Sequence, residues 1–369
     1  MKFAAGDRIF FLLVLALSLA GIAIFSSAAL GLLARSNASV SHEILLQVAL
    51  GLGLGYVGLV VARLLPLSLV RTYAPHLFGA TLFFTALVFV PGIGLHANGA
   101  TRWINAGFTT IQPAEFLKIG FVFMLAWWLA AHARALKDPK KGLGPFLTIG
   151  GIPALLLLAQ PNTSTTLVIL ATGAAMYFVS GAPWRDFAVL ASLAVLVFGA
   201  VVLFRPYVLQ RIDTFFNPSA HSLGASYQIQ QSLIAIGSGG LIGTGFGQGA
   251  EKFDYLPEPD GDSVFAVYAE ETGFIGALLL LTLFVGLAAR GLVISSNSRD
   301  LFGGLVAFGF SFMIIIQAFV NISAMLGIIP LTGIPLPFVS HGGTALVAIL
   351  FMCGFILNVA SRQQAAKLV

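Results

Sequence analysis

Charged residues are scarce in this chain. Asp, Glu, Lys and Arg together make up 9% of its 369 residues, whereas soluble domains carry roughly a quarter. Hydrophobic residues make up 58%, and the mean hydropathy is +0.96. Because a water-soluble surface cannot be built from so little charge, the sequence excludes a soluble protein and predicts an integral membrane protein.

Cysteine is almost absent as well. The one cysteine, Cys353, has no partner, which excludes a disulfide bond within the chain. The formal net charge is +5 and the pI is about 9.5, but the basic residues sit beside the ends of apolar runs rather than in one patch. We therefore do not expect a nucleic-acid partner.

Long apolar runs, by contrast, recur from end to end. A helix needs about 20 mostly apolar residues to cross a hydrocarbon core of about 30 Å, whereas a barrel would show short strands of alternating polarity instead of solid runs such as Ala277–Ala289. The sequence thus predicts an all-α polytopic protein, a single domain over 1–369 with ten transmembrane helices. The predicted spans are 9–33, 44–63, 76–91, 114–132, 145–160, 164–180, 187–205, 263–289, 302–325 and 343–361. The first is too long for the apolar region of a signal peptide, so we interpret it as a retained span.

Basic residues between the spans predict the orientation. With the N-terminus inside, 13 of them fall on the inner side and 5 on the outer side, which satisfies the positive-inside rule and places both termini in the cytoplasm. The inner set is Lys2, Arg8, Arg63, Arg71, Arg134, Lys137, Lys140, Lys141, Arg185, Arg290, Arg299, Arg362 and Lys367. The outer set is Arg35, Arg102, Arg205, Arg211 and Lys252.

Polar residues gather on the predicted outer side. The longest segment there, 206–262, lies between the seventh and eighth spans and holds six of the 14 acidic residues. A second outer segment, 91–112, carries Arg102, and a third, 327–342, carries Thr332 and Ser340. We therefore expect the chemistry on the extracytoplasmic face.

Two pairs of acidic or basic residues fall within predicted spans, where such groups are costly. Glu115 and Lys118 lie three residues apart, so on a helix they share a face and can pair, either for function or only to lock helix packing. The neighbours Glu270 and Glu271 point about 100° apart on a helix, so both cannot face one partner. At least one of them is expected to line a polar cavity or the bundle interior, with packing as the alternative.

Glycines mark two places of close approach. The spacing in 237–249 (GSGGLIGTGFGQG) imitates a dinucleotide-binding fingerprint, but no βαβ unit surrounds it. We interpret it instead as tight turns or a re-entrant segment against a neighbour. Gly51 and Gly55 form a GxxxG pair that predicts helix packing.

Three carboxylates crowd into Leu256–Phe265 (LPEPDGDSVF), where the long outer segment meets the eighth span. For Glu258 and Asp260 the ordinary interpretation is solvated loop charge. Asp262 is expected at the N-cap of the helix, a position that Asp takes for structural reasons, with catalysis as the alternative. Clustered oxygens suit a hard cation, but this spacing matches no defined ion-binding loop.

Four motifs in order resemble the SEDS family (shape, elongation, division and sporulation), and slightly more its FtsW branch than its RodA branch. They are GATRWINAGFTTIQPAEFLK (99–118), YQIQQSLIAIGSGGLIGTGFGQG (227–249), LPEPDGDSVFAVYAEETGFIG (256–276) and PLTGIPLPFVSHGG (330–343).

This resemblance implies a ten-helix peptidoglycan glycosyltransferase of the bacterial cytoplasmic membrane, which polymerises lipid II on the outer face in division or elongation. It also implies a class B penicillin-binding protein and divisome or elongasome membrane proteins as partners. The family's essential aspartate falls on Asp262. The remaining matches to its motifs are Arg102, Gln112, Glu115, Lys118, Thr332, Pro337, Ser340 and Gly343.

The chain departs from the family pattern at several positions. Asp260-Gly261 replaces the usual His-Thr, which weakens any role for a histidine beside the base. Ser263 replaces an aromatic residue, and His341 stands where Tyr is common. Asn162 stands where the family often has Asp, which puts in doubt a carboxylate contribution from the loop between the fifth and sixth spans.

The chemistry so implied is an inverting transfer, since an α-linked diphosphate donor gives a β-1,4 bond. Asp262 is expected to take the proton of the acceptor hydroxyl as general base. The leaving undecaprenyl pyrophosphate needs positive charge, first from Arg102, then from Lys118 and Arg211, with Lys252 or a divalent cation (Mg or Mn) as further sources. We also expect Glu258 to contact substrate. The rival functions are a lipid II flippase and a non-catalytic scaffold for the penicillin-binding protein.

Overall fold

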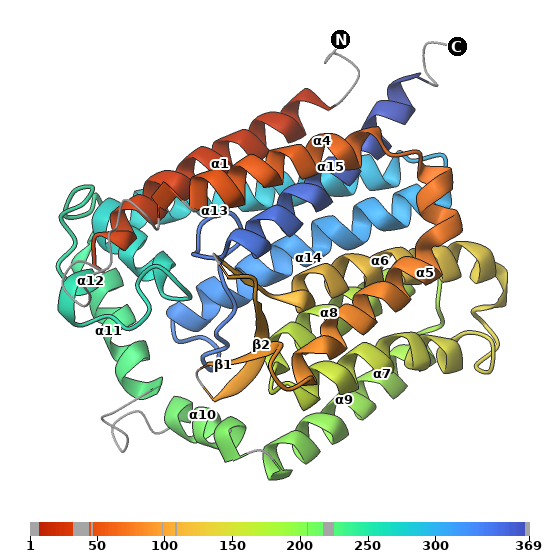
Figure 1. The fold of residues 1–369 in the computed structure, drawn as a ribbon, viewed down its shortest axis with the longest axis horizontal. Coiled ribbons are helices and arrows are strands. Elements are labelled where there is room, and N and C mark those ends of the chain that lie inside the picture. The colour runs from red at the N-terminus through yellow and green to blue at the C-terminus, as the bar shows by residue number, and fades with distance from the viewer. Residues whose placement is uncertain are drawn as a thin grey trace.

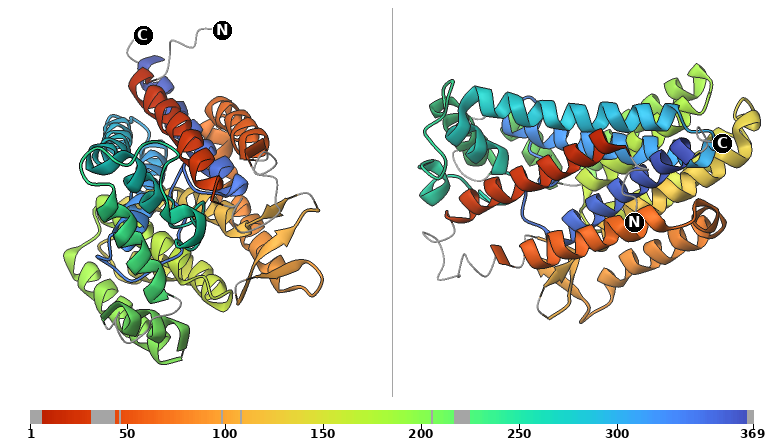
Figure 2. Two further views of the ribbon diagram at one scale, coloured as in Figure 1. Left: turned by 90° about the vertical axis from the view of Figure 1, so that its left-hand side faces the viewer. Right: turned by 90° about the horizontal axis from the view of Figure 1, so that it is seen from above.

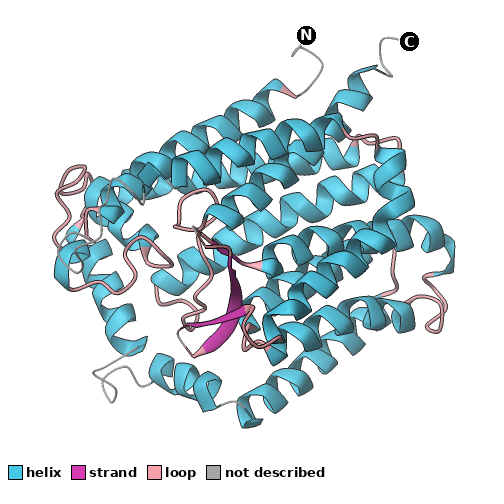
Figure 3. Cartoon of the chain, viewed as in Figure 1, coloured by secondary structure: helices cyan, strands magenta, loops and turns pink. Residues whose placement is uncertain are grey.

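Long helices form almost the whole of the computed structural model, which describes residues 7–31, 44–45, 47–97, 99–107, 109–204, 206–216 and 225–365 (Figures 1 and 3). The helices are α1 (Arg8–Ala29), α4 (Leu54–Leu64, directly preceded by a π-helical stretch Gln47–Gly53), α5 (Leu67–Ala86), α6 (Pro113–His132), α7 (Leu143–Ala159), α8 (Thr163–Val179), α9 (Trp184–Phe204), α10 (Pro206–Phe216), α11 (Ala225–Ser238), α12 (Glu251–Asp254), α13 (Val264–Ser296), α14 (Leu301–Met325) and α15 (Gly343–Ala365).

A helix occupies each of the ten predicted spans. Among the described residues, eight helices are long and apolar enough to cross a membrane, while α7 and α8 are shorter apolar helices of 17 residues each. α14 lies in the middle, packed against α6, α8, α13 and α15, and most of its side chains are buried (Figure 1). α9 is the opposite case, because nearly all of its side chains face outward.

Two predicted boundaries are wrong by seven residues or more. α5 begins at Leu67, nine residues before the predicted start at 76, because the helix continues through Arg71 and Pro75. α13 runs to Ser296, beyond the predicted end at 289, because Arg290 stays in the helix and pairs with Asp7. Arg71 therefore did not mark the start of α5, and Arg290 did not mark the end of α13.

α1 begins and α15 ends at the same end of the bundle, away from α11 and α12 (Figures 1 and 2). This agrees with an even number of crossings and with both termini on one side. Which side of a membrane that is stays a prediction. Of the basic residues behind that prediction, Lys2, Arg35, Arg205 and Lys367 lie outside the described residues.

A small antiparallel sheet, which the sequence did not predict, folds from the second outer segment. It consists of β1 (Gly94–Ala97), β2 (Ala100–Asn105) and β3 (Thr110–Ile111), in the order β1-β2-β3. Leu95 pairs with Trp103 and His96 with Thr101, with a register shift between Leu95 and His96. Strands this short, one of them irregular, lack the long alternation that identifies a strand in a sequence.

The segment predicted as one long outer loop, 206–262, contains α10, α11, α12 and the glycine-rich stretch. That stretch packs on α13 as the glycines predicted: a methyl group on Gly243 would stand 2.1 Å from the carbonyl oxygen of Glu271. α13 is itself interrupted at Gly273, whose φ of 67° suits glycine. The interruption frees backbone groups that the stretch binds, since Thr244 N–H donates to Glu270 O and Phe274 N–H donates to Gly240 O.

The GxxxG pair Gly51 and Gly55 packs against a neighbouring helix, as its spacing predicted. Gly51 and Gly55 face α15, where added methyl groups would stand 3.1 Å from Leu346 and 2.4 Å from Leu350. The two glycines therefore let the Gln47–Leu64 helix approach α15 closely, as small residues do between membrane helices.

Candidate active site

Asp262 lies where the long outer segment joins α13. The sequence predicted it as the N-cap of that helix, which is wrong by one residue: the N-cap is Ser263, and the cap makes no side-chain hydrogen bond. The carboxylate of Asp262 is thus not used to satisfy the helix end, which removes the structural explanation for its presence there.

The Asp262 carboxyl group is held by α11. Gln228 Nε2 donates to Asp262 Oδ1 and to Ser263 Oγ, each over 2.9 Å. Burial first, and then the charge of Glu258, raise the pKa of the Asp262 carboxyl to about 6, against the Gln228 hydrogen bond and the charge of Arg211, which lower it. A carboxylate with that pKa is ionised at neutral pH and is still basic enough to accept a proton.

Arg211, on α10, is brought close to Asp262 by the irregular segment 327–342 between α14 and α15, called the 330s segment below. Its Nη1 donates to Leu331 O over 3.1 Å and to Thr332 O over 3.4 Å. Gly333 lies beside both charged groups, since a methyl group on its Cα would stand 3.8 Å from Asp262 Oδ2 and 3.9 Å from Arg211 Nη2. Gly333 is exposed, so this carboxylate and guanidinium flank a surface that a ligand can reach.

The same segment connects to the turn between α7 and α8. Ser164, at the start of α8, donates its hydroxyl to Thr332 O. The hydroxyl of Thr332 itself is buried and has no hydrogen-bond partner in the described part of the chain. Segments that are far apart in the sequence therefore meet at one end of the bundle. Thr332, predicted as a substrate contact, lies next to the Asp262–Arg211 surface through its backbone.

Arg102, predicted as the first phosphate ligand, lies on β2 and is turned toward the α7–α8 turn. Its Nε donates to Gln160 O over 3.3 Å and its Nη2 donates to Pro161 O. Gln112 is the N-cap of α6, and its side chain makes no capping bond. Both residues are partly exposed.

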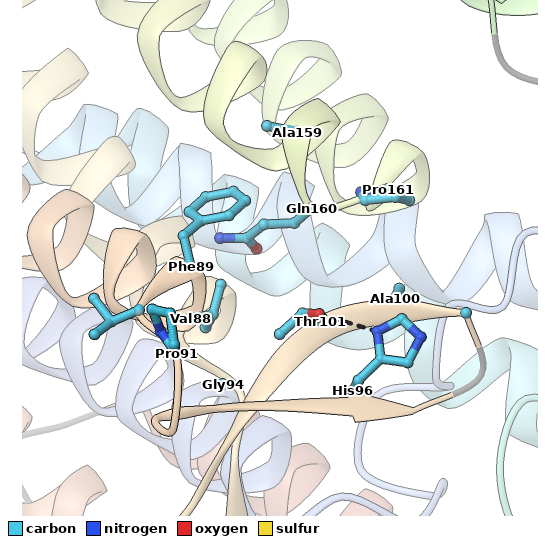
Figure 4. Close-up of a pocket in the computed structure, with 12 residues that line it drawn as sticks. Val88, Phe89, Pro91, Gly94, His96, Ala100, Thr101, Ala159, Gln160 and Pro161 are labelled. Atoms are coloured by element: carbon cyan, nitrogen blue, oxygen red, sulfur yellow. Dashed lines mark hydrogen bonds between the residues drawn. The ribbon is translucent and has the colours of Figure 1, made fainter.

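A cavity of about 450 Å³ opens beside Arg102, between the β1–β2 hairpin, the segment 88–91 that follows α5, and the α7–α8 turn (Figure 4). Phe89 and Gln160 extend toward each other across it, and His96 faces Thr101 over 3.1 Å on the hairpin. The lining is mixed, with apolar side chains such as Val88 and Pro91 beside these polar groups. Asp262 and Arg211 do not line this cavity.

Glu115 and Lys118 form the ion pair that their spacing predicted. Lys118 Nζ lies 2.8 Å from Glu115 Oε2, and both side chains are 3% exposed. Lys118 also donates to Gln317 Oε1 on α14 over 3.0 Å, and Gln317 Nε2 donates to Pro335 O. The pair therefore supports the 330s segment through Gln317. Because both side chains are buried, they are not placed to contact the leaving diphosphate directly.

Lys252 is not placed as a substrate ligand, which corrects the expectation from the sequence. It is fully buried, and its ammonium group donates to Ser27 Oγ, Gly247 O and Glu271 Oε1. Glu270 turns elsewhere and accepts from the backbone N–H of Ala250 over 2.8 Å. The two adjacent glutamates thus have different partners, as helix geometry requires, and together they hold the α12 region on α13.

Ser340 is likewise structural in its contacts. It is buried, and its hydroxyl accepts from Leu336 N–H over 2.7 Å. His341 stacks on Phe25 and lies 3.5 Å from Asp260 Oδ2, so Asp260 is paired rather than solvated. Glu258 is exposed with a φ of 45°, and its carbonyl accepts from Gly261 and Ser263, which closes the turn that presents Asp262.

Asn162 caps α8, because its Oδ1 accepts from Thr165 N–H over 3.4 Å. An asparagine caps a helix about as well as the aspartate that the family often has there. The substitution thus keeps the helix end and removes only a charge.

A resident divalent cation does not fit the donor set. In the part of the chain that the structure describes, no three His, Cys, Asp or Glu side chains gather closely enough to hold a metal ion. Gln228 donates to one oxygen of Asp262, and Asp260 faces His341. The predicted Mg or Mn ion stays a prediction, and we derive no step through it.

Two residues of the site were missed from the sequence. Gln228 and Asn321 both contact Asp262, and Asn321 does so from inside an apolar helix. The available signal was that Gln317 and Asn321 are polar and four residues apart in α14, so that they share one face.

The fold and the site together define a multi-pass membrane protein with a polar, carboxylate-bearing site at one end of its helix bundle. Residues 7–365 match the sequence profile of the FtsW/RodA/SpoVE family, described as "Cell cycle protein". The chain belongs to this family, which is the SEDS family that the four motifs indicated.

Individual relatives agree with this assignment. The chain is 41% identical to stage V sporulation protein E of Bacillus subtilis over 290 residues, which is 79% of each chain. It is 39% identical to the probable peptidoglycan glycosyltransferase FtsW of Coxiella burnetii over 323 residues, covering 86% of this chain and 85% of that protein.

Solved structures share the fold over nearly the full length. A chain from a structure entitled "Structural coordination of polymerization and crosslinking by a peptidoglycan synthase complex" matches with a TM-score of 0.81 at 29% identity, covering 98% of this chain and 99% of that one. The rod shape determining protein RodA of Thermus thermophilus matches with a TM-score of 0.71, also at 29% identity and covering 98% of both chains.

Proposed function

We propose that this protein is a peptidoglycan glycosyltransferase that polymerises lipid II, with Asp262 as general base. The observation that carries the proposal is the Asp262 carboxyl itself. It is outside the helix ladder, its pKa is about 6, and it lies beside Arg211 at an exposed glycine. The curated relatives named as peptidoglycan glycosyltransferases support the substrate class.

In the proposed reaction, the acceptor sugar hydroxyl loses its proton to Asp262 as its oxygen attacks the anomeric carbon of the donor. The bond from that carbon to the undecaprenyl pyrophosphate breaks in the same step, so the configuration inverts. Arg211 stabilises the negative charge that develops on the departing diphosphate. Because Lys118 and Lys252 are buried in ion pairs, Arg211 replaces them in this role, with Arg102 at the edge of the same end of the bundle.

The membrane and partner assignments are part of the same proposal. The apolar helices place the protein in a membrane, and we assign it to the bacterial cytoplasmic membrane with Asp262 on the outer face, where the lipid-linked sugar is polymerised. The match to a chain from a peptidoglycan synthase complex supports a class B penicillin-binding protein as partner.

Purified protein with lipid II and its penicillin-binding partner tests the proposal. Glycan strands formed by the wild type, and their absence when lipid II is omitted, are expected. Translocation of lipid II across vesicles without any polymer would instead identify a flippase. Against that rival, the buried ammonium groups of Lys118 and Lys252 are already paired with Glu115 and Glu271, respectively, and do not line a path for a lipid headgroup.

A further inference from the structure

Asn321 contacts the aspartate of the proposed site from the central helix α14. It is 1% exposed, and its Nδ2 donates to Asp262 O over 2.8 Å and to Ile334 O over 2.7 Å. We propose that Asn321 is a positioning residue that sets the orientation of Asp262 relative to the 330s segment. The inference deepens the proposed function and rests on it for its catalytic consequence.

The Asp262 carbonyl needs an outside donor because of where α13 begins. The first carbonyl used by the helix is that of Ser263, which accepts from Ala266 and Val267. The carbonyl of Asp262 precedes it and has no partner in the helix ladder. A buried carbonyl without a donor destabilises the fold. The Asn321 amide supplies this donor and thereby also holds the Asp262 peptide group in one orientation.

The second bond of Asn321 fixes the opposite wall of the site. Ile334 lies in the irregular segment between α14 and α15, where backbone carbonyls lack a regular partner. Two residues earlier, Thr332 O accepts from Arg211, and Gly333 lies beside Asp262 Oδ2. One amide group therefore sets the separation between the backbone that bears the carboxylate and the backbone that holds the arginine.

The chemistry of the side chain supports this role over simple packing. Two carbonyl acceptors can be served only by the NH₂ end of the amide. The other end, Oδ1, is then buried with no hydrogen-bond partner among the residues that the structure describes. An unsatisfied buried oxygen destabilises the fold, so an apolar residue would fill this space more favourably unless the two bonds to the backbone mattered.

The chain provides a matched control in Asn358 on α15. It is also 1% exposed, and its Nδ2 also donates to two backbone carbonyls, Ala62 O over 2.9 Å and Leu65 O over 2.6 Å. Asn358 lies where α4 ends and α5 begins, away from Asp262. Asn321→Ala and Asn358→Ala therefore remove the same amide from equally buried places. Asn358 Oδ1 additionally accepts from Arg362 Nε over 2.9 Å, and only Asn321 contacts Asp262.

The experiment compares wild type, Asn321→Ala, Asn321→Ser and Asn358→Ala in lipid II polymerisation, with rates expressed per folded protein. A small misplacement of a catalytic group costs about 10²-fold. We expect Asn321→Ala to lose kcat by about that factor with an unchanged KM for lipid II, and Asn321→Ser, which keeps one donor, to regain part of it. Asn358→Ala should keep the kcat of the wild type. Equal kcat losses in the two alanine variants, or no recovery with serine, would overturn the proposal.

A second measurement does not depend on activity. Asp262→Asn should raise the melting temperature at neutral pH, because it removes a buried charge. That gain should shrink when Asn321→Ala is also present, since the carboxylate is then free to turn toward water, and it should persist with Asn358→Ala. An unchanged gain in both backgrounds would overturn the positioning role. Absence of polymer from the wild type would contradict only the proposed function. The melting temperatures of the variants would still test whether Asn321 positions Asp262.

Discussion

The side-chain amide of Gln228 donates to Asp262 Oδ1 over 2.9 Å and leaves Oδ2 on the side of exposed Gly333. One oxygen of the carboxylate is thus fixed by α11, and the other is oriented toward the surface that Arg211 also reaches. A general base needs this arrangement, because the oxygen that accepts the proton must be available while the group as a whole stays in place.

The pH dependence of polymerisation follows from the pKa of Asp262, which burial raises to about 6. The base acts in its ionised form, so the rate should be constant above pH 7 and fall about tenfold per pH unit below the pKa. Initial rates of glycan formation between pH 4.5 and 8 measure this. A rate that stays level down to pH 4.5 would exclude Asp262 as the base.

Gln228→Leu should shift the acid limb of that pH–rate profile to higher pH. The Gln228 hydrogen bond stabilises the ionised carboxylate, so its loss raises the pKa of Asp262 and shifts the acid limb to higher pH. Gln230→Leu is the control, because Gln230 is on the same helix but exposed. An identical acid limb in both variants would show that the Gln228 contact has no influence on the base.

Asp262→Asn should stabilise the protein, and only at the higher pH values. The folded-state pKa of about 6 lies above the ordinary aspartate value of 3.8, so the cost of ionising the carboxyl accumulates as pH rises from about 4 to 6 and is constant above that. Melting curves should therefore show a higher Tm for the variant at pH 7.5 and equal values at pH 3.5. A lower Tm at pH 7.5 would mean that the charge is well solvated or paired.

Much of the fold could be predicted because one physical signal dominates it. A membrane span must be apolar along its whole length, and this placed a helix in all ten predicted spans. Boundaries failed at Arg71 and Arg290, because a basic side chain at the end of a helix can pair or reach toward water without ending it. The β1–β2 hairpin gave no comparable signal.

The site was predicted in part for a similar reason. The position of Asp262 at a boundary between loop and span was visible in the sequence, and so was the Glu115–Lys118 spacing. What the sequence could not show was which charged groups are already paired in the fold. Lys252 was expected to face substrate, yet its partners Ser27 and Glu271 are distant in sequence.

For Lys252 we therefore predict an effect on stability rather than on the polymerisation rate. Lys252→Met leaves Glu271 as a buried, unpaired carboxylate, a change that typically costs about 3–5 kcal/mol. The double variant Lys252→Met with Glu271→Gln removes both charges and should recover most of the lost melting temperature. If the single variant melts like the wild type but binds lipid II more weakly, Lys252 is a ligand after all.

The most direct test of Asp262 as the base is polymerisation by Asp262→Ala beside wild type, each purified with the same penicillin-binding partner and supplied with lipid II. The account predicts glycan strands from the wild type and none above background from the variant, at equal amounts of folded complex. Strands of normal yield from Asp262→Ala would contradict it.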